Sequence, residues 1–352
     1  MAKGTNRRID IHTVANRANV SIATVSRVIN GVGTVNRAMT SRVQRAIAEL
    51  GYSPNTHARS LVSGRSRIIG LIVTLITNPF YPELIQNFET LAAESGYDIL
   101  IGSTNYRPER KLDCLRRMEE RKVDGIAMMT FGADDELLRS LVERRFPVVS
   151  IGSSGLRGVQ PIQVNFDQGI HEAVQHLAVL GHRRIAFISG PLRVDNSLAR
   201  QTAFFEAMRA IGARIPKGYV FEGDHSMESG FRATEKMLAL SERPTAILCS
   251  NDMTAIGALH AVCDRKMHVP EDISIVGFDD IQMAQYTVPP LTSVRMSGED
   301  IARVALAILI PMIEGGDAPQ QEVVPTQLIV RKSTGYAPAA NAVKSPPRRK
   351  QK

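Results

Sequence analysis

The sequence has no tryptophan, only three cysteines and no apolar run long enough to cross a bilayer. A transmembrane helix needs about 20 consecutive apolar residues, so a membrane-spanning protein is excluded. Cys114, Cys249 and Cys263 are odd in number and form no Cys-x-x-Cys pair, which argues against a disulfide framework and against a zinc site. We expect them to be buried small side chains in a reducing compartment.

The enzyme motifs that can be recognised from spacing are also missing. The chain contains no GxxxxGK[ST] phosphate loop, no GxSxG nucleophile turn and no HExxH zinc motif. His171, His176 and His182 are five and six residues apart, whereas a helix aims two imidazoles at one metal when they are four apart. We therefore expect no enzyme, no cofactor and no metal, and we expect these histidines to be solvated or to cap helices.

The chain is long enough for a large folded core. Its 352 residues correspond to two to three domains of about 150 residues. Hydrophobic residues at 43% and charged residues at 22% are near the averages of soluble proteins, which excludes a wholly disordered chain. The N-terminal segment MAKGTNRRID is charged and leads into no apolar signal sequence, so we expect a cytoplasmic protein without membrane contact.

Positive charge is concentrated at the two ends of the chain. Residues 1–67 carry eleven basic and two acidic side chains, a charge of +9, and residues 338–352 add five basic side chains. Since the whole chain carries +8, residues 68–337 carry −6. A basic head on a mildly acidic body favours a polyanionic partner, nucleic acid above all, because phosphate contacts release condensed counterions.

Three short helices are predicted in this head. Apolar residues at helical spacing predict helices over residues 11–18, 22–29 and 37–50. Asn19 tolerates the left-handed backbone of a tight turn, and Ser21 can cap the second helix. Two helices joined by a three-residue turn form a helix-turn-helix. Three-helix modules also bind proteins, but the basic charge favours DNA.

The segment VANRANVSIATVSRVINGVGTVNRAMTSRVQRAIAELGYSPNTHARSLVSG resembles the DNA-binding head of the LacI/GalR (lactose-repressor) family. The combination of VSxxTVSRVxN, ELGYxPN and ARSL makes the resemblance specific. It implies that Ile22 and Ala23 read base edges in the major groove and that Arg27 contacts a guanine. It further implies contacts to phosphates from Ser21, Thr24, Ser26 and Asn30.

A short polar stretch over residues 55–63 follows the head. Nine residues alone do not hold a helix in water, so we expect this stretch to be disordered until it meets DNA. In the family it is a hinge helix that forms on the operator, pairs with its dimer mate and inserts a leucine into the minor groove. The resemblance gives this role to Leu61, with Asn55 and Ala58 also at the DNA. The alternative is that Leu61 is a linker residue packed on the body.

From residue 68 onward, apolar runs alternate with amphipathic helical segments. The runs include IIGLIVTL, DILIGST, GIAMMTF and VVSIG, then RIAFISG, YVFEGD, AILCSND and ISIVGFDD. This α/β pattern predicts two doubly wound lobes with parallel sheets covered by helices. We divide the chain into a DNA-binding domain at 1–54, a hinge at 55–66, a two-lobed body at 67–337 and a disordered basic tail at 338–352. We expect the lobes to be connected near 152–166, 281–297 and 320–325.

Ligands of such folds bind at the carboxyl ends of the strands, in a cleft between lobes. Asp279 follows an apolar strand and could accept two hydroxyls or an amine, whereas Arg200 could donate to hydroxyls or a carboxylate. Each has a simpler alternative role, and for Asp279 this is a helix cap.

The body continues the resemblance through NPFYPELIQ, HLAVLGHRRIAFISGP and VPEDISIVGFDD, so that it covers about residues 9–335. It implies a periplasmic-binding-protein-like body in which Asp279 and Arg200 contact the effector. The same matching adds Phe80, Tyr81, Asn196, His225 and Asn251. As alternatives, Phe80 and Tyr81 could be ordinary core, Asn251 a helix cap and His225 a surface group.

Two positions depart from the pattern of several relatives. Gly152 stands where some have an acidic residue, and His225 stands where some have a large aromatic. The loss of an aromatic platform disfavours a stacked purine, while Asp279 with Arg200 fits a sugar, polyol or sugar acid.

The predicted function is a homodimeric transcriptional regulator, in its simplest form a repressor. A small effector controls its affinity for a pseudo-palindromic operator in double-stranded DNA. The tail lacks leucine heptads, which favours a dimer over a tetramer. An enzyme of small-sugar metabolism and a solute-binding protein, each fused to a DNA-binding head, remain as alternatives.

Overall fold

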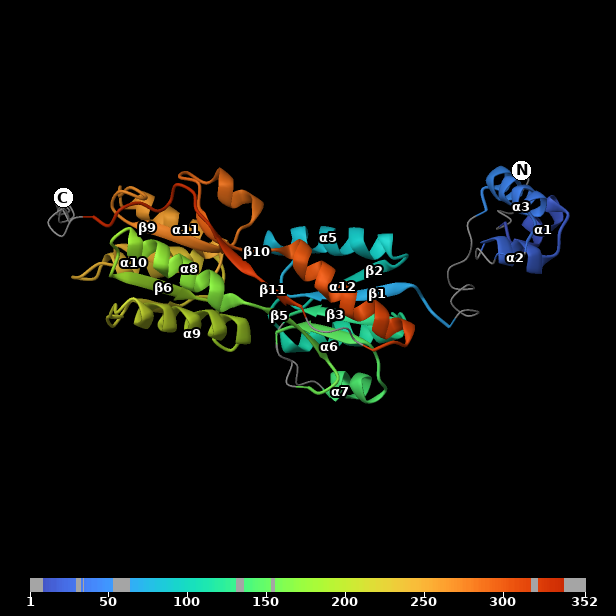
Figure 1. Cartoon of the computed structure of the whole chain (residues 1–352), viewed down its shortest axis with the longest axis horizontal. Helices are drawn as coiled ribbons and strands as arrows, with labels where there is room; N and C mark the ends of the chain where they lie inside the picture. The colour runs from blue at the N-terminus through green and yellow to red at the C-terminus, as the bar shows by residue number, and fades with distance from the viewer. Residues whose placement is uncertain are drawn as a thin grey trace, which may run out of the picture. The chain divides into compact units, whose positions relative to one another are not determined.

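The computed structural model describes residues 9–29, 33, 35–52, 64–130, 136–152, 156–317 and 322–338. The chain divides into two compact units, Met1–Ser66 and Arg67–Lys352 (Figure 1). Four predicted DNA contacts lie outside the described residues, namely Asn30, Asn55, Ala58 and Leu61. Residues 339–352 of the predicted tail also lie outside them. Within the described ranges, no helix has the length and apolar character needed to span a membrane.

The first unit consists of three helices around a small core. They are α1 (Ile11–Ala18), α2 (Ile22–Ile29) and α3 (Arg37–Leu50), at the predicted bounds. The boundaries follow from capping: the Asp10 carboxylate accepts from the Thr13 amide at 2.9 Å, and the Asn36 side chain accepts from the Met39 amide at 2.9 Å. Six buried residues form the core, namely Val14, Ala15, Ala18, Val25, Val43 and Ala46.

The second unit contains two sheets. We call each sheet, together with the helices that cover it, a lobe, and number the lobes first and second in chain order. The first sheet has the order β11-β5-β4-β3-β1-β2, and its neighbouring strands are parallel. The strands are β1 (Ile68–Val73), β2 (Asp98–Ser103), β3 (Gly125–Met129), β4 (Val148–Ile151), β5 (Gln160–Val164) and β11 (Val323–Val324). Its helices are α5 (Phe80–Glu94), α6 (Pro108–Glu120), α7 (Glu136–Glu143) and α12 (Gly298–Glu314).

Side-chain alternation explains why helices cover both faces of this sheet. Ile69, Leu71 and Val73 of β1 share a core with residues of α5 and α12, whereas Ile72 belongs to a separate core with residues of α6 and α7. In Figure 1, α5 and α12 accordingly lie on one side of the strands and α6 and α7 on the other.

The second sheet has the order β12-β10-β9-β8-β6-β7. The strands are β6 (Ile185–Ser189), β7 (Val220–Glu222), β8 (Ala246–Cys249), β9 (Ser274–Asp279), β10 (Thr292–Met296) and β12 (Thr326–Ile329). Its helices are α8 (Phe166–Val179), α9 (Asp195–Ala210), α10 (Met227–Leu238) and α11 (Asp252–Asp264), with the 3-10 helix η1 (Gln282–Tyr286). The edge strand β12 runs antiparallel to β10, so this sheet is not wholly parallel.

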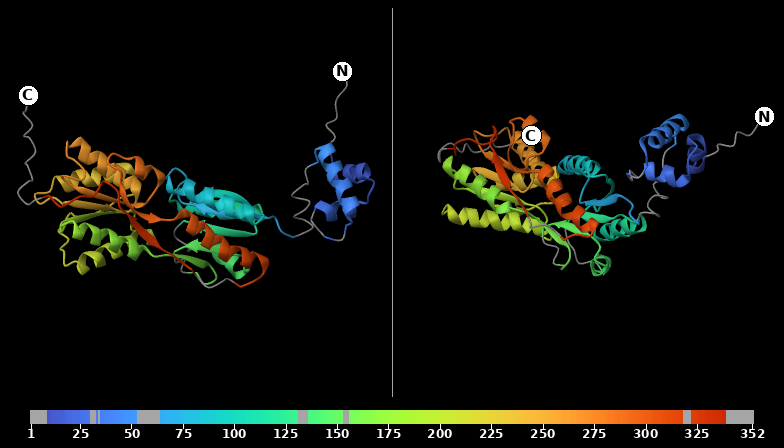
Figure 2. Two further views of the ribbon diagram at one scale, coloured as in Figure 1. Left: turned by 45° about the horizontal axis from the view of Figure 1, so that its top comes forward. Right: turned by 45° about the vertical axis from the view of Figure 1, so that its right-hand side comes forward.

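The chain passes between the two lobes three times (Figure 2). It leaves the first lobe between β5 and α8, returns between β10 and α12, and leaves again between β11 and β12. These passages lie at residues 165, 297 and 325. Two of them are short links between a strand and a helix, and the third joins two strands.

The connection expected near 152–166 lies at residue 165, and the same stretch also contains the strand β5, which was not expected. Two expectations from the sequence are wrong. Cys263 is exposed, whereas Cys114 and Cys249 are buried as expected. His182 is fully buried and bonded to Thr245 Oγ1 at 2.9 Å, so it is neither solvated nor a cap.

Candidate functional site

The predicted reading helix α2 presents polar and small side chains on its exposed face. Ser21, Ile22, Ala23 and Arg27 are exposed, and Ile22 is 40% exposed although it is a large apolar residue. Val25 points into the core and fixes which face is outward. An exposed face with one long cation and two small or apolar side chains suits contact with base edges in a groove.

The remaining described DNA candidates on α2 are half-buried. Ser21 Oγ accepts from the Thr24 amide at 3.2 Å, so it caps the helix, and Thr24 Oγ1 lies 2.9 Å from the same oxygen. Thr24 and Ser26 are partly buried. These short hydroxyl side chains suit contact with phosphates.

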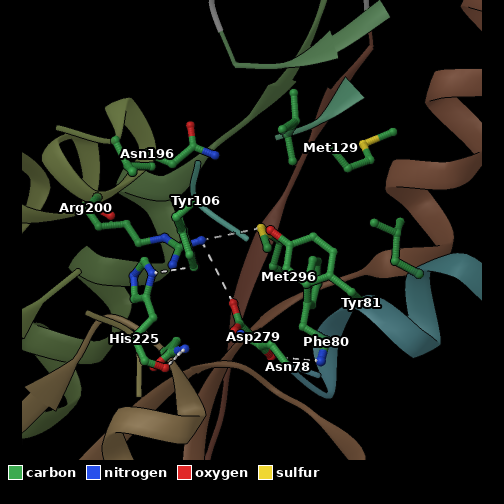
Figure 3. Close-up of a pocket in the computed structure, with 15 residues that line it drawn as sticks. Asn78, Phe80, Tyr81, Tyr106, Met129, Asn196, Arg200, His225, Asp279 and Met296 are labelled. Atoms are coloured by element: carbon green, nitrogen blue, oxygen red, sulfur yellow. Dashed lines mark hydrogen bonds and ion pairs between the residues drawn. The ribbon is translucent and has the colours of Figure 1, made fainter. Parts of the chain in front are cut away.

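The seven predicted effector residues lie in one pocket between the two lobes (Figure 3). Phe80 and Tyr81 come from α5 in the first lobe, and the other five come from the second lobe. Those five are Asn196 and Arg200 on α9, His225 before α10, Asn251 before α11, and Asp279 at the end of β9. The segments that follow the carboxyl ends of β6, β7 and β8, together with the end of β9, therefore supply the polar wall of the pocket.

Arg200 is the cation of the pocket and is 5% exposed. Its Nη1 donates to the Ser250 carbonyl at 2.6 Å, and its guanidinium stacks 4.0 Å from the centre of the Phe278 ring. Nη2 lies 3.9 Å from Asp279 Oδ1, too far for a direct hydrogen bond. The two charges therefore attract each other while both remain open to a ligand hydroxyl.

Asp279 carries the buried carboxylate opposite Arg200. Burial raises its pKa to about 7, although Arg200 acts in the opposite direction, and Glu83 raises it further. His225 is also buried, and burial together with Arg200 lowers its pKa to about 3. At neutral pH the pocket thus combines a guanidinium, a neutral imidazole and a carboxyl group close to its titration point.

Three buried polar atoms at the pocket have no hydrogen-bond partner among the described residues. They are Ser197 Oγ, Arg200 Nε and His225 Nε2. Buried polar groups are normally bonded, so such atoms lining a pocket indicate a ligand or water that completes them. Asn251, in contrast, makes two hydrogen bonds through its side chain. The side-chain oxygen caps α11 by accepting from the Thr254 amide at 2.9 Å, and the side-chain nitrogen donates to the His225 carbonyl at 3.2 Å.

The wall that the first lobe contributes is largely apolar. Phe80, Tyr81, Leu84, Met129 and Ile151 line it, and Phe80 and Tyr81 meet edge to face with ring centres 5.4 Å apart. A ligand with one apolar face and one face of hydroxyl or carboxylate groups matches these two walls, and a sugar ring has this character.

Tyr106 joins the two lobes at the pocket. It follows β2 in the first lobe, and its hydroxyl lies 3.2 Å from Nδ1 of His225 in the second lobe (Figure 3). Both residues have a left-handed backbone, with φ of 58° and 65°.

Sequence reasoning missed Tyr106, Ser197 and Asn78, which also line the pocket. Tyr106 could have been found, because it comes shortly after the carboxyl end of a predicted strand. Gly152, one of the two departures from the family pattern, faces Asn196 across the cleft. A Cβ at Gly152 would lie 3.0 Å from Asn196 Oδ1, so the glycine leaves room for that amide.

Comparison with family models gives two matches. The model for bacterial regulatory proteins of the lacI family matches residues 10–55, and the model for a periplasmic binding protein-like domain matches residues 174–334. These regions include α1 to α3 of the first unit and most of the second lobe.

Curated proteins match over nearly the whole chain. Catabolite control protein A of Priestia megaterium is 35% identical over 303 residues, which cover 86% of this chain and 91% of that protein. The HTH-type transcriptional repressor PurR of Klebsiella pneumoniae (strain 342) is 33% identical over 332 residues, or 93% of this chain and 97% of that protein. These names describe regulators and not enzymes.

Solved structures show the same relationship. The Lac repressor dimer bound to operator and the anti-inducer ONPF has a TM-score of 0.84 at 26% identity and covers 94% of this chain and 100% of that chain. The complex of the transcriptional regulator CelR with cellobiose has a TM-score of 0.69 at 30% identity and covers 93% and 100%. The chain described here belongs to the LacI family of bacterial regulatory proteins.

Proposed function

We propose that this protein is a homodimeric transcriptional repressor whose affinity for a pseudo-palindromic operator is controlled by a small effector. The observation that carries the proposal is the joint presence of an outward-facing α2 in the first unit and a polar pocket between lobes in the second. Related proteins bear the names of repressors, and one solved relative is a dimer bound to operator. The protein acts in the cytoplasm, where chromosomal DNA is found.

The first unit reads DNA through α2. Arg27 donates to a guanine, Ile22 and Ala23 contact thymine methyls or the groove surface, and Ser21, Thr24 and Ser26 hold phosphates. Asn30, Asn55, Ala58 and Leu61, outside the described residues, complete the contact, with Leu61 as a minor-groove wedge. Two units in a dimer grip half-sites about one helical turn apart.

The effector is a sugar, polyol or sugar acid. Asp279 and Arg200 bind its hydroxyl or carboxylate groups, Asn196, His225 and Asn251 add further polar contacts, and Phe80 and Tyr81 cover its apolar face. Among the described residues, no group of three or more His, Cys, Asp or Glu could hold a metal, and no reaction is proposed for this site. The pocket binds its ligand without converting it.

Control of DNA binding follows from the position of the pocket between the lobes. A ligand that prefers one arrangement of the lobes shifts the population towards it, and a 100-fold preference supplies about 2.7 kcal/mol. The shift changes the pairing of the hinge segments in the dimer and thereby the affinity for operator.

A thermal-shift screen with sugars, polyols and sugar acids tests this function. An effector at 100 times its dissociation constant stabilises the folded state by about 2.7 kcal/mol, which raises the Tm measurably. Each compound that raises the Tm is then added to a titration of DNA selected by the protein, where it changes the affinity.

The matched variants are Asp279→Asn, which loses the Tm shift, and Asp264→Asn at the exposed end of α11, which keeps it. If Asp279→Asn responds to the compound as the wild type does, the effector binds elsewhere.

A further inference from the structure

The backbone that carries Asp279 is unusual. Asp279 has φ of 104° and Asp280 has φ of 57°, so two successive residues with side chains lie in the left-handed region. This region is disfavoured for L-residues, and it persists where surrounding contacts hold it. Strained residues of this kind cluster at functional sites, and Asp279 is the residue whose carboxylate enters the pocket.

A buried hydrogen-bond network holds the residues that follow Asp279. The Asp280 amide donates to Ser293 Oγ at 3.1 Å, and Ser293 Oγ donates to Asp252 Oδ1 at 2.5 Å. The other oxygen of Asp252, Oδ2, accepts from the Ile281 amide at 2.8 Å. Asp252 and Ser293 are both fully buried, and they come from α11 and β10. Two successive amides after Asp279 are therefore fixed by side chains from two other elements.

The side chain of Asp280 is anchored separately. Its carboxylate lies 2.8 Å from Arg295 Nε on β10 and 2.7 Å from Arg331 Nη1 after β12. Asp280 is not among the residues that line the pocket, whereas Asp279 is. The two neighbouring carboxylates thus serve different partners, and the ion pairs of Asp280 oppose any rotation of the chain that would withdraw Asp279.

The sequence makes room for this network at Gly277. A Cβ on Gly277 would lie 2.0 Å from Asp252 Oδ1, so a side chain in the middle of β9 would expel the carboxylate. The glycine allows Asp252 to approach the strand from α11 and to reach the amide of Ile281. None of Gly277, Asp252 and Ser293 lines the pocket.

We propose that Asp252, Ser293 and Asp280 are positioning residues that hold Asp279 in its left-handed backbone and so keep its carboxylate in the pocket. The inference rests on the proposed function for the role of the pocket in binding an effector. The positioning itself is a property of the chain without any ligand.

The charged environment of Asp279 provides a readout of its position. Arg200, Asp252, Glu83, Tyr81 and Tyr106 are the titratable groups that interact with it. Burial raises the pKa of Asp279 to about 7, so between about pH 4 and pH 7 this carboxyl group ionises in the unfolded state while it stays protonated in the folded state. The stability of the fold therefore falls as the pH rises through this window. If the carboxylate leaves its buried place for solvent, this contribution disappears. Asp252, whose pKa is also raised by burial, adds a decline of the same sign.

The experiment compares Ser293→Ala with Thr234→Val in the full-length protein. Thr234 is a matched control because its hydroxyl is fully buried and has no hydrogen-bond partner among the described residues. Hydrogen exchange is measured at the Asp280 and Ile281 amides, and the Tm is measured from pH 5 to pH 8. Asp279→Asn, which cannot ionise, is made in the wild-type and in the Ser293→Ala background, and in each it defines the part of the pH profile that belongs to Asp279.

In Ser293→Ala we expect at least 10-fold faster exchange at Asp280 and a fall in Tm with pH that Asp279→Asn no longer makes shallower. The comparison is made within one background because the Ser293 hydroxyl lowers the pKa of Asp252, so its loss alters the contribution of Asp252 as well. Thr234→Val keeps the exchange rate and the steeper fall of the wild type. Wild-type exchange in Ser293→Ala would overturn the proposal. Faster exchange together with a pH profile that Asp279→Asn still makes shallower would overturn it too, because the carboxylate would then stay in place without the network. Neither measurement uses DNA or an effector, so the result does not depend on whether the proposed function holds.

Discussion

A buried arginine and a buried aspartate determine the chemistry of the pocket. Arg200 is held by the Ser250 carbonyl and by the Phe278 ring, and Asp279 is held by its backbone. Their side chains are 3.9 Å apart, which leaves both charges incompletely satisfied. Such a pair binds a polar ligand well because the protein has already met the cost of burying and orienting the charges.

Removal of Arg200 should destabilise the protein in a pH-dependent way. Arg200→Met keeps most of the packing on Phe278 but leaves Asp279 without its cation, which costs about 3 to 5 kcal/mol where Asp279 is ionised. The pKa of Asp279 is about 7 and rises further without Arg200, so the carboxyl group is neutral at pH 5 and the loss is smaller there. Urea unfolding at pH 5 and pH 8 measures both values.

The surface pair of Arg265 with Glu235 is the matched control. Their atoms are 2.8 Å apart but partly exposed, so Arg265→Met should cost at most about 1 kcal/mol at either pH. An equal loss for Arg200→Met at pH 5 and pH 8 would show that Asp279 does not titrate as described.

Individual residues of the pocket could be predicted only where they follow a recognisable strand or match a position of the family. Asp279 and Arg200 follow strands that are plainly apolar in sequence, and the matching to the family added the other five. Tyr106 was missed although it comes shortly after a predicted strand, and Ser197 was missed because nothing in the sequence distinguishes it from other small polar residues. The left-handed backbone at Asp279 could not be predicted either, since it depends on Asp252 and Ser293, which lie 27 residues before and 14 residues after it in the chain.

At the level of elements, residues near the helix ends explain where the helices of the first unit begin. Asp10, Ser21 and Asn36 are polar residues just before apolar-periodic stretches, and all three accept from amides at helix starts. The strand β5 was missed because its sequence QPIQV contains a proline and only two apolar aliphatic residues. It pairs with β4 on one side and with the two-residue strand β11 on the other, so tertiary pairing outweighs its weak propensity.

The element that we expect to read DNA is α2, and Arg27→Ala tests it. If Arg27 donates to a guanine, its loss should weaken specific binding by about 1 to 3 kcal/mol and relax the preference at one base pair. Competition between selected DNA and its single-base variants, at one fixed salt concentration, measures both effects.

Arg116→Ala on α6 is a control of equal charge change, since Arg116 is exposed on the second unit. It should leave the base preference unchanged. Full specificity in Arg27→Ala would remove this residue from the reading face.

For the whole molecule, the proposed function requires two copies of the chain. A pseudo-palindrome presents two related half-sites, and one reading unit per chain can occupy only one of them. Light scattering at micromolar concentration should therefore give twice the 38.6 kDa of one chain. A mass of one chain at all concentrations, or of four chains, would contradict the expected dimer.

The division of the molecule follows from its composition and was accessible from sequence. The basic residues of the first 67 positions and the strand-helix alternation after residue 68 separate a DNA-binding unit from a ligand-binding body. Ligand identity was not accessible, because it depends on the shape of a pocket assembled from two helices, several strand ends and the loops between them in both lobes. Gly152 is an example, because a Cβ there would lie 3.0 Å from Asn196 Oδ1.

The most direct test of the account is selection of DNA fragments by the purified protein. Random genomic fragments are offered at low ionic strength, with and without cell extract as a source of effector, and the bound fragments are sequenced. The account predicts enrichment of one pseudo-palindromic sequence, with a yield that differs between the two conditions. Failure to enrich any sequence in either condition would contradict it.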